Sequence, residues 1–523
     1  MLNEEERIQN ILKDLRDRDC ITEELYQSLR PRGSQPPRLY GLAKVHKQDI
    51  PMRPVLSMPG SAYHKVGCQV AKWLSIVPEC NINTSTKTVR DSIKDIQIED
   101  DEELVSFDVC SLYTNVPVKE AIDVCTDLLF KQCIMPIDRE TFKTLAEIAS
   151  CNVILSTHDG FYQQIDGLAM GSPPAPHLAN GWLSTFDSAI QGSSSLYSRY
   201  MDDVFKKEKS VKVEDKLDEI NTLHPSLTFT CEREKEGKLS HLDMEVIRKN
   251  KSLESTWYRK PTDTGLILNY HSLAPKRYKR SIVSGFVHRI HRSCSNIQLF
   301  EESLEKAKKT LEMNQYPPQF YEPIISETLE KIRKEEEKDQ NDVSTSSEED
   351  TSLDIEDNSI IDPNACQHQI DDKDKFLLFV QYRGKTSEEY ASALHRINAP
   401  CRIVFTLRKL STVLPSRKPS VETMIRSNVV YKITCPQCKL CYVGQTCRQL
   451  QCRFREHASN KGPVKTHFHE CNTEPREKDV DILAYTSRGM KYLLTLEALF
   501  INDIRPSLNT KDEFRSRTLT IKF

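Results

Sequence analysis

Two adjacent carboxylates stand between two short runs of aromatic and β-branched residues, in the stretch Ser198-Arg199-Tyr200-Met201-Asp202-Asp203-Val204-Phe205. This pattern predicts a strand, a tight turn and a second strand, with the Asp pair at the turn. Neighbouring carboxylates repel each other, so such a turn is costly unless a cation or hydrogen bonds offset the charge. Taken alone, an Asp pair is more often an ordinary solvated turn.

A third acid upstream gives the pair a chemical meaning. Apolar residues alternate with other residues over positions 104–109, which predicts a strand with one face in a core and Asp108 pointing into a cleft. A strand with one acid, a helix, and then a hairpin with two acids is the layout of a two-metal phosphoryl-transfer site. Carboxylates at Asp108 and Asp202 can bridge two Mg²⁺ ions about 3.5–4 Å apart, with Asp203 supporting the metal pair electrostatically.

Six sequence blocks stand in a fixed order along the first half of the chain. They are Arg38–Lys47, Pro51–Ser57, Ser106–Pro117, Gly167–Pro173, Tyr200–Asp203 and Leu239–Asp243. In combination these blocks resemble the motifs of reverse transcriptases, and specifically those of Penelope-like retroelement proteins. The resemblance covers residues 8–296 and 376–510.

The resemblance implies an α+β right-hand polymerase with fingers, palm and thumb, and then a small α/β GIY-YIG nuclease domain. The expected parts are a reverse transcriptase at 1–315 (fingers and palm 31–260, thumb 261–315), an acidic disordered linker at 316–375, a connector at 376–426, and the endonuclease at 427–515. The linker follows from composition, because the acidic, Ser/Thr-rich stretch has almost no aromatic residues.

Five residues are expected to bind the incoming nucleotide. By resemblance Lys44, Lys47 and Arg53 hold its triphosphate, and Tyr113 packs under its sugar and excludes a ribose 2′-hydroxyl. Gly171 belongs to a loop whose backbone must approach a ligand closely. A solvated basic loop and an ordinary core aromatic are the alternative interpretations.

Charge is distributed unevenly along the chain. Residues 335–375 contain 15 Asp or Glu and three Lys, so the remainder carries a net charge of +9 although the whole chain carries −3. Basic folded parts are what phosphate binding requires. No apolar run approaches ~18 residues, so no membrane span is expected. Seventeen cysteines without framework spacing indicate a reducing compartment.

The C-terminal part contains two predicted strands, Asn428–Ile433 and Cys441–Thr446. They are similar to the two strands of GIY-YIG nucleases, although Val-Val-Tyr stands in place of Gly-Ile-Tyr. A helix downstream carries Arg453 and His457 at i, i+4 on one face, and Glu497 lies in an apolar helix where a carboxylate is unexpected unless it binds something.

The resemblance assigns catalytic roles within this module. Tyr431 or Tyr442 helps to deprotonate water, Arg453 stabilises the phosphate charge, and Glu497 holds one Mg²⁺ ion. His457 and Asn509, which ends the module, complete the expected catalytic set.

Cysteines and histidines in the same module indicate a zinc site. Cys435 and Cys438 form a Cys-x2-Cys knuckle, which presents two of the four ligands that tetrahedral Zn²⁺ takes. The second pair is ambiguous among His467, His469 and Cys471, of which His467 and His469 are the expected pair, and Cys441 is a further candidate. A catalytic role for His467 is an alternative. Reduced free thiols are the alternative.

The sequence therefore predicts a retroelement protein with two activities. The nuclease nicks target DNA, and the polymerase extends the freed 3′-hydroxyl with deoxynucleoside triphosphates by copying an RNA template. Such a protein works in the nucleus after synthesis in the cytoplasm. Two alternatives stay open: a catalytically silent nucleic-acid-binding remnant, and an endonuclease whose polymerase half only docks nucleic acid.

Overall fold

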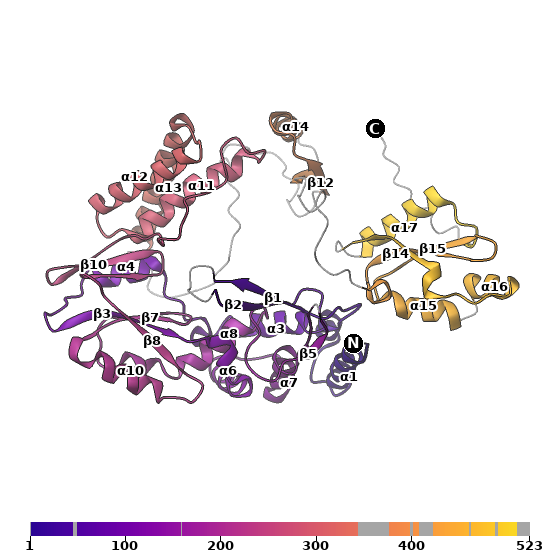
Figure 1. Ribbon diagram of the computed structural model, residues 1–523, viewed down its shortest axis with the longest axis horizontal. Helices are drawn as coiled ribbons and strands as arrows, with labels where there is room; N and C mark the ends of the chain where they lie inside the picture. Colours follow the sequence, from indigo (N-terminus) through magenta and orange to yellow (C-terminus); the bar gives the residue numbers. More distant parts are fainter. Residues whose placement is uncertain are drawn as a thin grey trace.

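The computed structural model describes residues 2–44, 50–157, 159–343, 376–397, 401–406, 422–459, 462–486 and 490–509. It is a mixed α+β structure, as expected, in which a large α/β body is followed by a group of long helices, a small connector and a C-terminal module (Figure 1). No helix in these described ranges combines the length and apolar character needed to cross a membrane.

A four-stranded antiparallel sheet carries the three acids of the first site, in the strand order β6-β7-β3-β8. Its strands are β3 (Glu102–Val109), β6 (Tyr197–Tyr200), β7 (Asp203–Lys209) and β8 (Phe229–Arg233). The predicted alternation is confirmed, because Val105, Phe107 and Val109 are buried in the main core. Leu104, on the opposite face, is buried in a second cluster with Phe205. Apolar packing on both faces therefore fixes the sheet.

Helices and a small sheet cover the two faces. Helices α6 (Val118–Gln132) and α10 (Val213–Asn221) lie below the central sheet in Figure 1, and α4 (Thr86–Ile93) lies above it with a three-stranded meander. The meander comprises β9 (Lys238–His241), β10 (Met244–Lys249) and β11 (Ser252–Trp257).

The meander corrects one predicted strand. The sequence predicts Leu239–Val246 and Ser252–Trp257 as the two strands of a hairpin around Asn250-Lys251, and the pairing of β10 with β11 confirms that hairpin. The single strand expected over Leu239–Val246 is wrong, because the chain turns between β9 and β10, with Leu242 at φ 55°. A positive φ at a leucine is uncommon and ends a strand.

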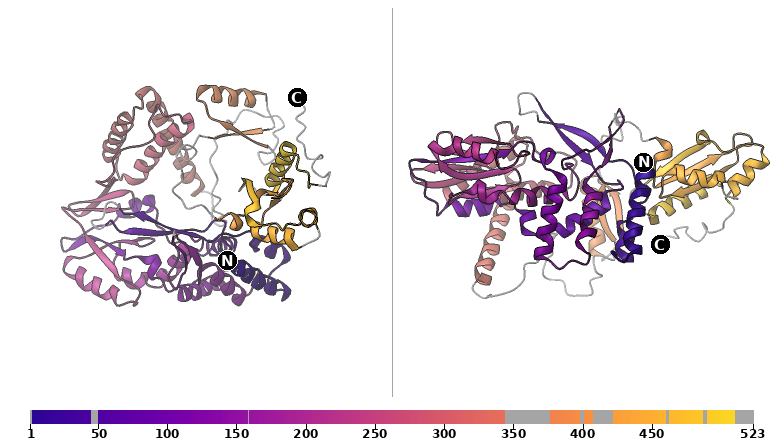
Figure 2. Two further views of the ribbon diagram at one scale, coloured as in Figure 1. Left: turned by 45° about the vertical axis from the view of Figure 1, so that its right-hand side comes forward. Right: turned by 90° about the horizontal axis from the view of Figure 1, so that it is seen from below.

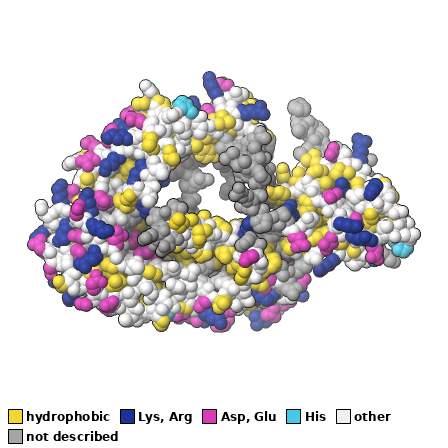
Figure 3. Space-filling model, in the orientation of Figure 1, with side chains coloured by type: hydrophobic (Ala, Val, Ile, Leu, Met, Phe, Trp, Pro, Cys, Tyr) yellow, Lys and Arg dark blue, Asp and Glu magenta, His cyan; other side chains and the backbone are white. Residues whose placement is uncertain are grey.

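A second four-stranded sheet, in the order β2-β1-β4-β5, stands beside the opening at the centre of Figure 1. Its strands are β1 (Arg38–Ala43), β2 (Met52–Ser57), β4 (Ile154–Ser156) and β5 (Phe161–Gln163). The helices packed in the core beside it include α3 (His64–Leu74), α7 (Arg139–Ser150) and α8 (Ala175–Ser184). Hydrophobic side chains gather along the lower edge of the opening in Figure 3, and Tyr40, Leu42 and Met52 of this sheet are exposed.

Three long helices form a separate core: α11 (Lys276–Ser293), α12 (Ile297–Met313) and α13 (Pro318–Val343). The start of the linker at residue 316 is therefore wrong. Tyr321, Ile324, Ile325 and Ile332 of α13 are buried in this core, and the charged residues between them occupy the exposed face of the helix. An acid-rich composition conceals an amphipathic helix when its apolar residues are spaced by three and four. Residues 344–375 lie outside the described residues.

The C-terminal parts are two small units. The connector pairs β12 (Phe376–Gln381) in parallel with β13 (Cys401–Thr406) through α14 (Lys385–Arg396). The last module is an antiparallel sheet in the order β15-β14-β16. Its elements are β14 (Val429–Thr434), β15 (Cys441–Thr446), α15 (Leu450–Ser459), α16 (Pro463–Glu470), β16 (Val480–Tyr485) and α17 (Met490–Ile504). Both strands that the sequence predicts here are confirmed.

The N-terminal helices α1 (Leu2–Asp17) and α2 (Glu23–Leu29) lie beside the C-terminal module (Figure 2). The loop that follows α2 makes the contact. The Gln449 side-chain amide donates to the Ser34 carbonyl oxygen at 2.8 Å, and both residues are buried. Gly33 has φ 66°, and a Cβ there would collide with the Cys447 carbonyl oxygen, so this close approach requires glycine.

Candidate active sites

Strand register brings the upstream acid and the Asp pair to one end of the central sheet. β3 and β7 pair antiparallel with Asp108 directly opposite Asp203. Residues paired in this way project from the same face, with Cβ atoms about 4.5–5.5 Å apart. The Val109 N–H donates to the Asp202 carbonyl oxygen at 3.0 Å, which holds the turn against β3. Three acidic residues from distant parts of the chain therefore lie at one end of the sheet.

Opposing charges act on Asp202. Burial raises the pKa of its carboxyl group, and the neighbouring Asp203 raises that pKa further, while Arg53 and Lys44 lower it. Arg53 lies on β2, and Lys44 follows β1, so the second sheet directs its cations towards the acids. Lys47 lies outside the described residues. The site thus combines carboxylates of the central sheet with basic residues from the second sheet.

The donor set of the acids suits magnesium, which prefers oxygen ligands. Asp108 is exposed and Asp202 is half-buried. Asp203 is turned towards the protein, because one oxygen accepts from Ser106 Oγ at 2.8 Å and the other lies 3.1 Å from His241 Nδ1. This geometry favours Asp108 and Asp202 as the metal ligands. Sequence reasoning gave Ser106 and His241 no role.

Tyr113 lies beside the acids, on the short helix α5 (Leu112–Asn115). Burial raises the pKa of its hydroxyl to about 12, with contributions from the charges of Asp202 and Tyr200. Its carbonyl oxygen accepts from the Leu168 N–H at 2.6 Å. Tyr113 therefore lies within range of the Asp202 charge, and its role under the nucleotide sugar stays a prediction.

The glycine loop packs against the chain itself. The Met170 carbonyl oxygen accepts from the Leu56 N–H of β2 at 2.7 Å. Gly171 has φ 106°, and a Cβ there would collide with the Leu56 carbonyl oxygen. Gly167, at φ 79°, approaches the backbone of Thr114 in the same way. The close approach expected of this loop is therefore to β2 and α5, and its contact with a ligand stays a prediction.

A buried arginine supports the turn that carries the acids. Arg199 is 1% exposed. Its guanidinium donates to both oxygens of Asp187, at 2.7 and 2.9 Å, and to Asn180 Oδ1 at 2.8 Å and the Met201 carbonyl oxygen at 3.2 Å. These bonds join β6 to α8 and to α9 (Asp187–Gln191). The sequence alone assigns Arg199 no role, and a charged residue within an aromatic strand run is the signal that points to it.

The C-terminal module gathers a second set of side chains. The Tyr431 hydroxyl lies 2.7 Å from His457 Nε2, and the Tyr442 ring centroid lies 5.0 Å from that of His457. Gly444 stands opposite Tyr431 across the strands, and a Cβ there would press on both tyrosine rings. Gly444 lies in the predicted strand Cys441–Thr446, where the sequence alone assigns it no role. Its lack of a side chain makes room for the two rings.

Charge links these tyrosines to the predicted arginine and glutamate. Burial raises the pKa of Tyr431 and of Tyr442, Arg453 lowers both pKa values, and Glu497 raises both. Glu497 is 7% exposed on α17, and Arg453 donates to Glu456 at 2.8 Å on α15. The four predicted residues on β14, β15, α15 and α17 therefore act on one another within one site, which Glu456 extends.

Asn509 has a positioning geometry. Its side-chain oxygen accepts from the Val443 N–H at 2.9 Å, and its side-chain nitrogen donates to the Val443 carbonyl oxygen at 2.7 Å. The asparagine thus fastens the end of the module to β15, beside Tyr442. Its predicted catalytic role remains a prediction.

A pH effect follows from His457. Burial, and then the charge of Arg453, lowers its pKa to about 4 from the ordinary 6.5. Between these values the unfolded chain binds a proton that the folded chain does not, so stability falls as the pH drops from 6.5 towards 4. The shift corresponds to about 3 kcal/mol, which partial exposure of the ring reduces to about 2 kcal/mol.

Chemical unfolding of the full chain at pH 7 and pH 4.5 measures this loss. His457→Gln should lose less stability on acidification than the unsubstituted chain, and the exposed His469→Gln should behave like the unsubstituted chain. An equal loss in all three proteins contradicts the assignment.

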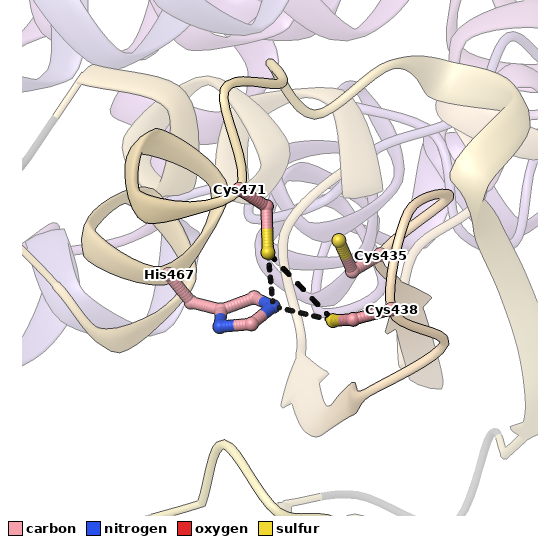
Figure 4. Close-up of side chains that lie close together, drawn as sticks. All are labelled: Cys435, Cys438, His467 and Cys471. Atoms are coloured by element: carbon pink, nitrogen blue, oxygen red, sulfur yellow. Dashed lines mark hydrogen bonds between the residues drawn. The ribbon is translucent and has the colours of Figure 1, made fainter.

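Four side chains in the same module form a group with metal-binding geometry: Cys435, Cys438, His467 and Cys471 (Figure 4). All four ligand atoms lie within 4.8 Å of one another. The Cys438 and Cys471 sulfurs are 3.8 Å apart, which matches the spacing of about 3.8 Å that Zn–S bonds of about 2.3 Å give at tetrahedral angles. Burial alone would raise the pKa of Cys435, but backbone N–H donors of Cys438 and Gln437 outweigh it and lower that pKa to about 6.

This group corrects the predicted zinc ligands. His467 is confirmed within the group, but His469 is wrong and Cys471 takes its place. Residues 467 and 471 are separated by four positions at the end of α16, which puts them on one helix face, whereas position 469 points elsewhere and is exposed. Cys441, the other candidate, is not part of the group. Among the described residues this is the one set of three or more such ligands so close together, so the three aspartates are more widely spaced.

Comparison with protein families gives one match. Residues 266–326, which include α11 and α12, match the animal helix-turn-helix domain. No curated protein matches the chain.

Solved structures give distant likenesses. A telomerase from Candida albicans, in complex with a fragment of telomeric RNA, has a TM-score of 0.39 at 10% identity, covering 59% of this chain and 56% of that one. The RNA-dependent RNA polymerase of a human picobirnavirus has a TM-score of 0.38 at 16% identity, covering 58% and 62%. A Sicinivirus RNA-dependent RNA polymerase has a TM-score of 0.32 at 10% identity, covering 58% and 71%.

The chain spans a little over half the length of the telomerase chains that it matches. All three TM-scores lie below 0.5, so the case for each site depends on its own residues.

Proposed function

We propose that this chain is an RNA-directed DNA polymerase coupled to a DNA-nicking endonuclease, in a protein of the Penelope-like retroelement class. The single observation that carries the polymerase is the β3–β7 register, which sets Asp108 opposite Asp203. Basic residues that act on Asp202 from the facing sheet support it. Carboxylates of the central sheet, together with cations from the second sheet, suit a metal-bound nucleoside triphosphate.

Each polymerase residue then has a task. Asp108 and Asp202 would hold two magnesium ions, which activate the primer hydroxyl and stabilise the leaving pyrophosphate when bound. Arg53 and Lys44 neutralise the triphosphate, and Tyr113 sets the position of the sugar. Catalysis in this arrangement is positioning plus charge stabilisation, with no covalent protein intermediate.

Primer extension tests this activity directly. The purified chain is given an RNA template, a DNA primer and the four deoxynucleoside triphosphates with magnesium, and product length is followed with time. Extension on RNA supports the proposal. Binding of the primer–template without extension supports the alternative of a silent nucleic-acid-binding remnant.

The C-terminal module is proposed as the nuclease. Tyr431 and Tyr442 help to deprotonate the attacking water, Arg453 stabilises charge on the phosphate, and Glu497 would hold a magnesium ion that polarises that phosphate. The approach of the Tyr431 hydroxyl to His457 at 2.7 Å supports a proton path between them. Nicking without any primer extension would favour the alternative of an endonuclease that only docks nucleic acid through its polymerase half.

The helices α11 and α12 are proposed to contact duplex nucleic acid as a thumb. Their match to a helix-turn-helix family supports this role, because helix-turn-helix domains place a helix against nucleic acid. Arg277 and Arg289 are among the basic residues on α11. Target DNA lies in the nucleus, so we propose that the protein works there after synthesis in the cytoplasm.

Zinc removal provides a separate test of the C-terminal module. The four ligand atoms fit Zn²⁺, so the purified chain should contain about one zinc ion, and Cys438→Ser or Cys471→Ser should remove it and lower the melting temperature of the module. His469→Ala is the matched control, because its side chain is exposed outside the group. Mass spectrometry measures the zinc content of each variant. Zinc loss in His469→Ala alone would contradict the ligand set.

A further inference from the structure

A chain of hydrogen bonds runs behind Asp203. Ser106 Oγ donates to one carboxylate oxygen at 2.8 Å, and His241 Nδ1 lies 3.1 Å from the other. Because a carboxylate only accepts, Nδ1 carries the hydrogen. The far ring nitrogen, Nε2, lies 3.3 Å from Ser198 Oγ. Both oxygens of Asp203 are therefore oriented from within the protein.

Packing fixes the histidine in this chain. His241 is 1% exposed and its ring stacks on Phe205, with centroids 4.9 Å apart at 14°. It comes from β9, outside the central sheet, so this side chain joins the meander to Asp203. A buried ring whose two nitrogens both have polar partners has little freedom to reorient.

The order Ser198, His241, Asp203 also matches the triad of serine hydrolases, but its burial excludes that chemistry. Ser198 is 3% exposed, and a nucleophile must reach the reacting atom of a substrate. The chain of bonds can act only through Asp203, which keeps about a third of its side chain exposed.

We propose that His241 is a positioning residue for the polymerase metal site, and that Ser198 and Ser106 complete this unit. By holding the Asp203 carboxylate against β3 and β9, it leaves Asp202 and Asp108 to present oxygens to the metal pair. Asp203 then acts on the metals mainly through its charge. This inference rests on the proposed polymerase function. Replacing a residue that hydrogen-bonds to a group at a metal site typically lowers metal affinity or activity by about 10–100-fold.

Two substitutions separate the hydrogen bond from the packing. His241→Leu removes the donor to Asp203, whereas His241→Asn places an amide N–H near the position of Nδ1. We expect His241→Leu to weaken Mn²⁺ binding by about tenfold or more, and His241→Asn to recover most of it. The readout is free Mn²⁺ measured by electron paramagnetic resonance, with the Mn²⁺ dependence of primer extension as a second readout.

The control is His224→Leu, a histidine that packs on Trp182 and lies 3.4 Å from a Glu120 oxygen. Circular dichroism melts confirm that each variant is folded at the temperature of the assay, and Ser106→Ala replaces His241→Leu if the latter is not. Unchanged Mn²⁺ binding in folded His241→Leu overturns the inference, as does an equal loss in the Asn and Leu variants. Mn²⁺ binding without any extension by the unsubstituted chain defeats the polymerase proposal and leaves this comparison valid.

Discussion

Asp202→Asn is expected to reduce primer extension by about 10³-fold, the scale on which one preorganised charge stabilises a transition state. The substitution keeps the shape of the side chain and removes its negative charge. RNA binding should be unchanged or slightly tighter, because Asp202 repels phosphate and contributes no attraction to it. The measurement is single-nucleotide extension of a DNA primer on an RNA template, with filter binding of the same template.

The thermal stability of Asp202→Asn should not fall with its activity. The pKa of Asp202 is raised in the folded state, first by burial and then by Asp203, so ionisation at neutral pH disfavours folding and the destabilisation disappears as the pH falls below the folded pKa. A neutral Asn should therefore leave the melting temperature equal or higher. Loss of activity with gain of stability is the signature of a functional residue. The control is Asp215→Asn, at an exposed position on α10, and full extension by Asp202→Asn contradicts the assignment.

Local patterns predicted most of the elements on which the sites stand. Alternation predicted β3, aromatic and β-branched runs predicted β6 and β7, and the i, i+4 spacing of Arg453 and His457 predicted α15. These signals depend on neighbours in sequence, since burial of one face imposes its period on the chain. The same holds for β14 and β15, whose bounds differ from the expected ones by at most one residue at either end.

Other features depend on contacts between distant segments, which a period does not encode. The pairing of Asp108 with Asp203 is a matter of register between strands far apart in the chain. The partners of Asp203 come from β3 and β9, and only the folded chain sets them side by side. The zinc ligand Cys471, in contrast, could have been predicted from local spacing. Once α16 is recognised as a helix, the four-residue spacing from His467 selects Cys471 and not His469.

The end of the polymerase part shows how composition misleads. The acids that mark residues 335–375 begin inside α13, and the boundary at 316 cut away buried residues such as Tyr321 and Ile332. Net charge describes the exposed face of a helix, whereas burial depends on the spacing of the few apolar residues.

Glu497→Ala is expected to reduce plasmid nicking by about 10²–10³-fold while primer extension stays unchanged. Glu497 is a buried carboxylate on α17 that raises the pKa of both Tyr431 and Tyr442. Removing it lowers the pKa of both tyrosines, so loss of nicking cannot come from a smaller population of ionised tyrosine. The remaining explanation is loss of the group that would hold the magnesium ion.

Conversion of supercoiled plasmid to open circles in the presence of Mg²⁺ measures this effect. Glu474→Gln is the matched control, because that carboxylate is exposed in the same module. The two proposed sites stand on separate sheets, so Asp202→Asn should nick at the unsubstituted rate and Glu497→Ala should extend primers at the unsubstituted rate. Nicking that survives Glu497→Ala in a folded protein removes the nuclease role from α17, and because the polymerase acids stand on other strands, that result would leave the polymerase assignment intact.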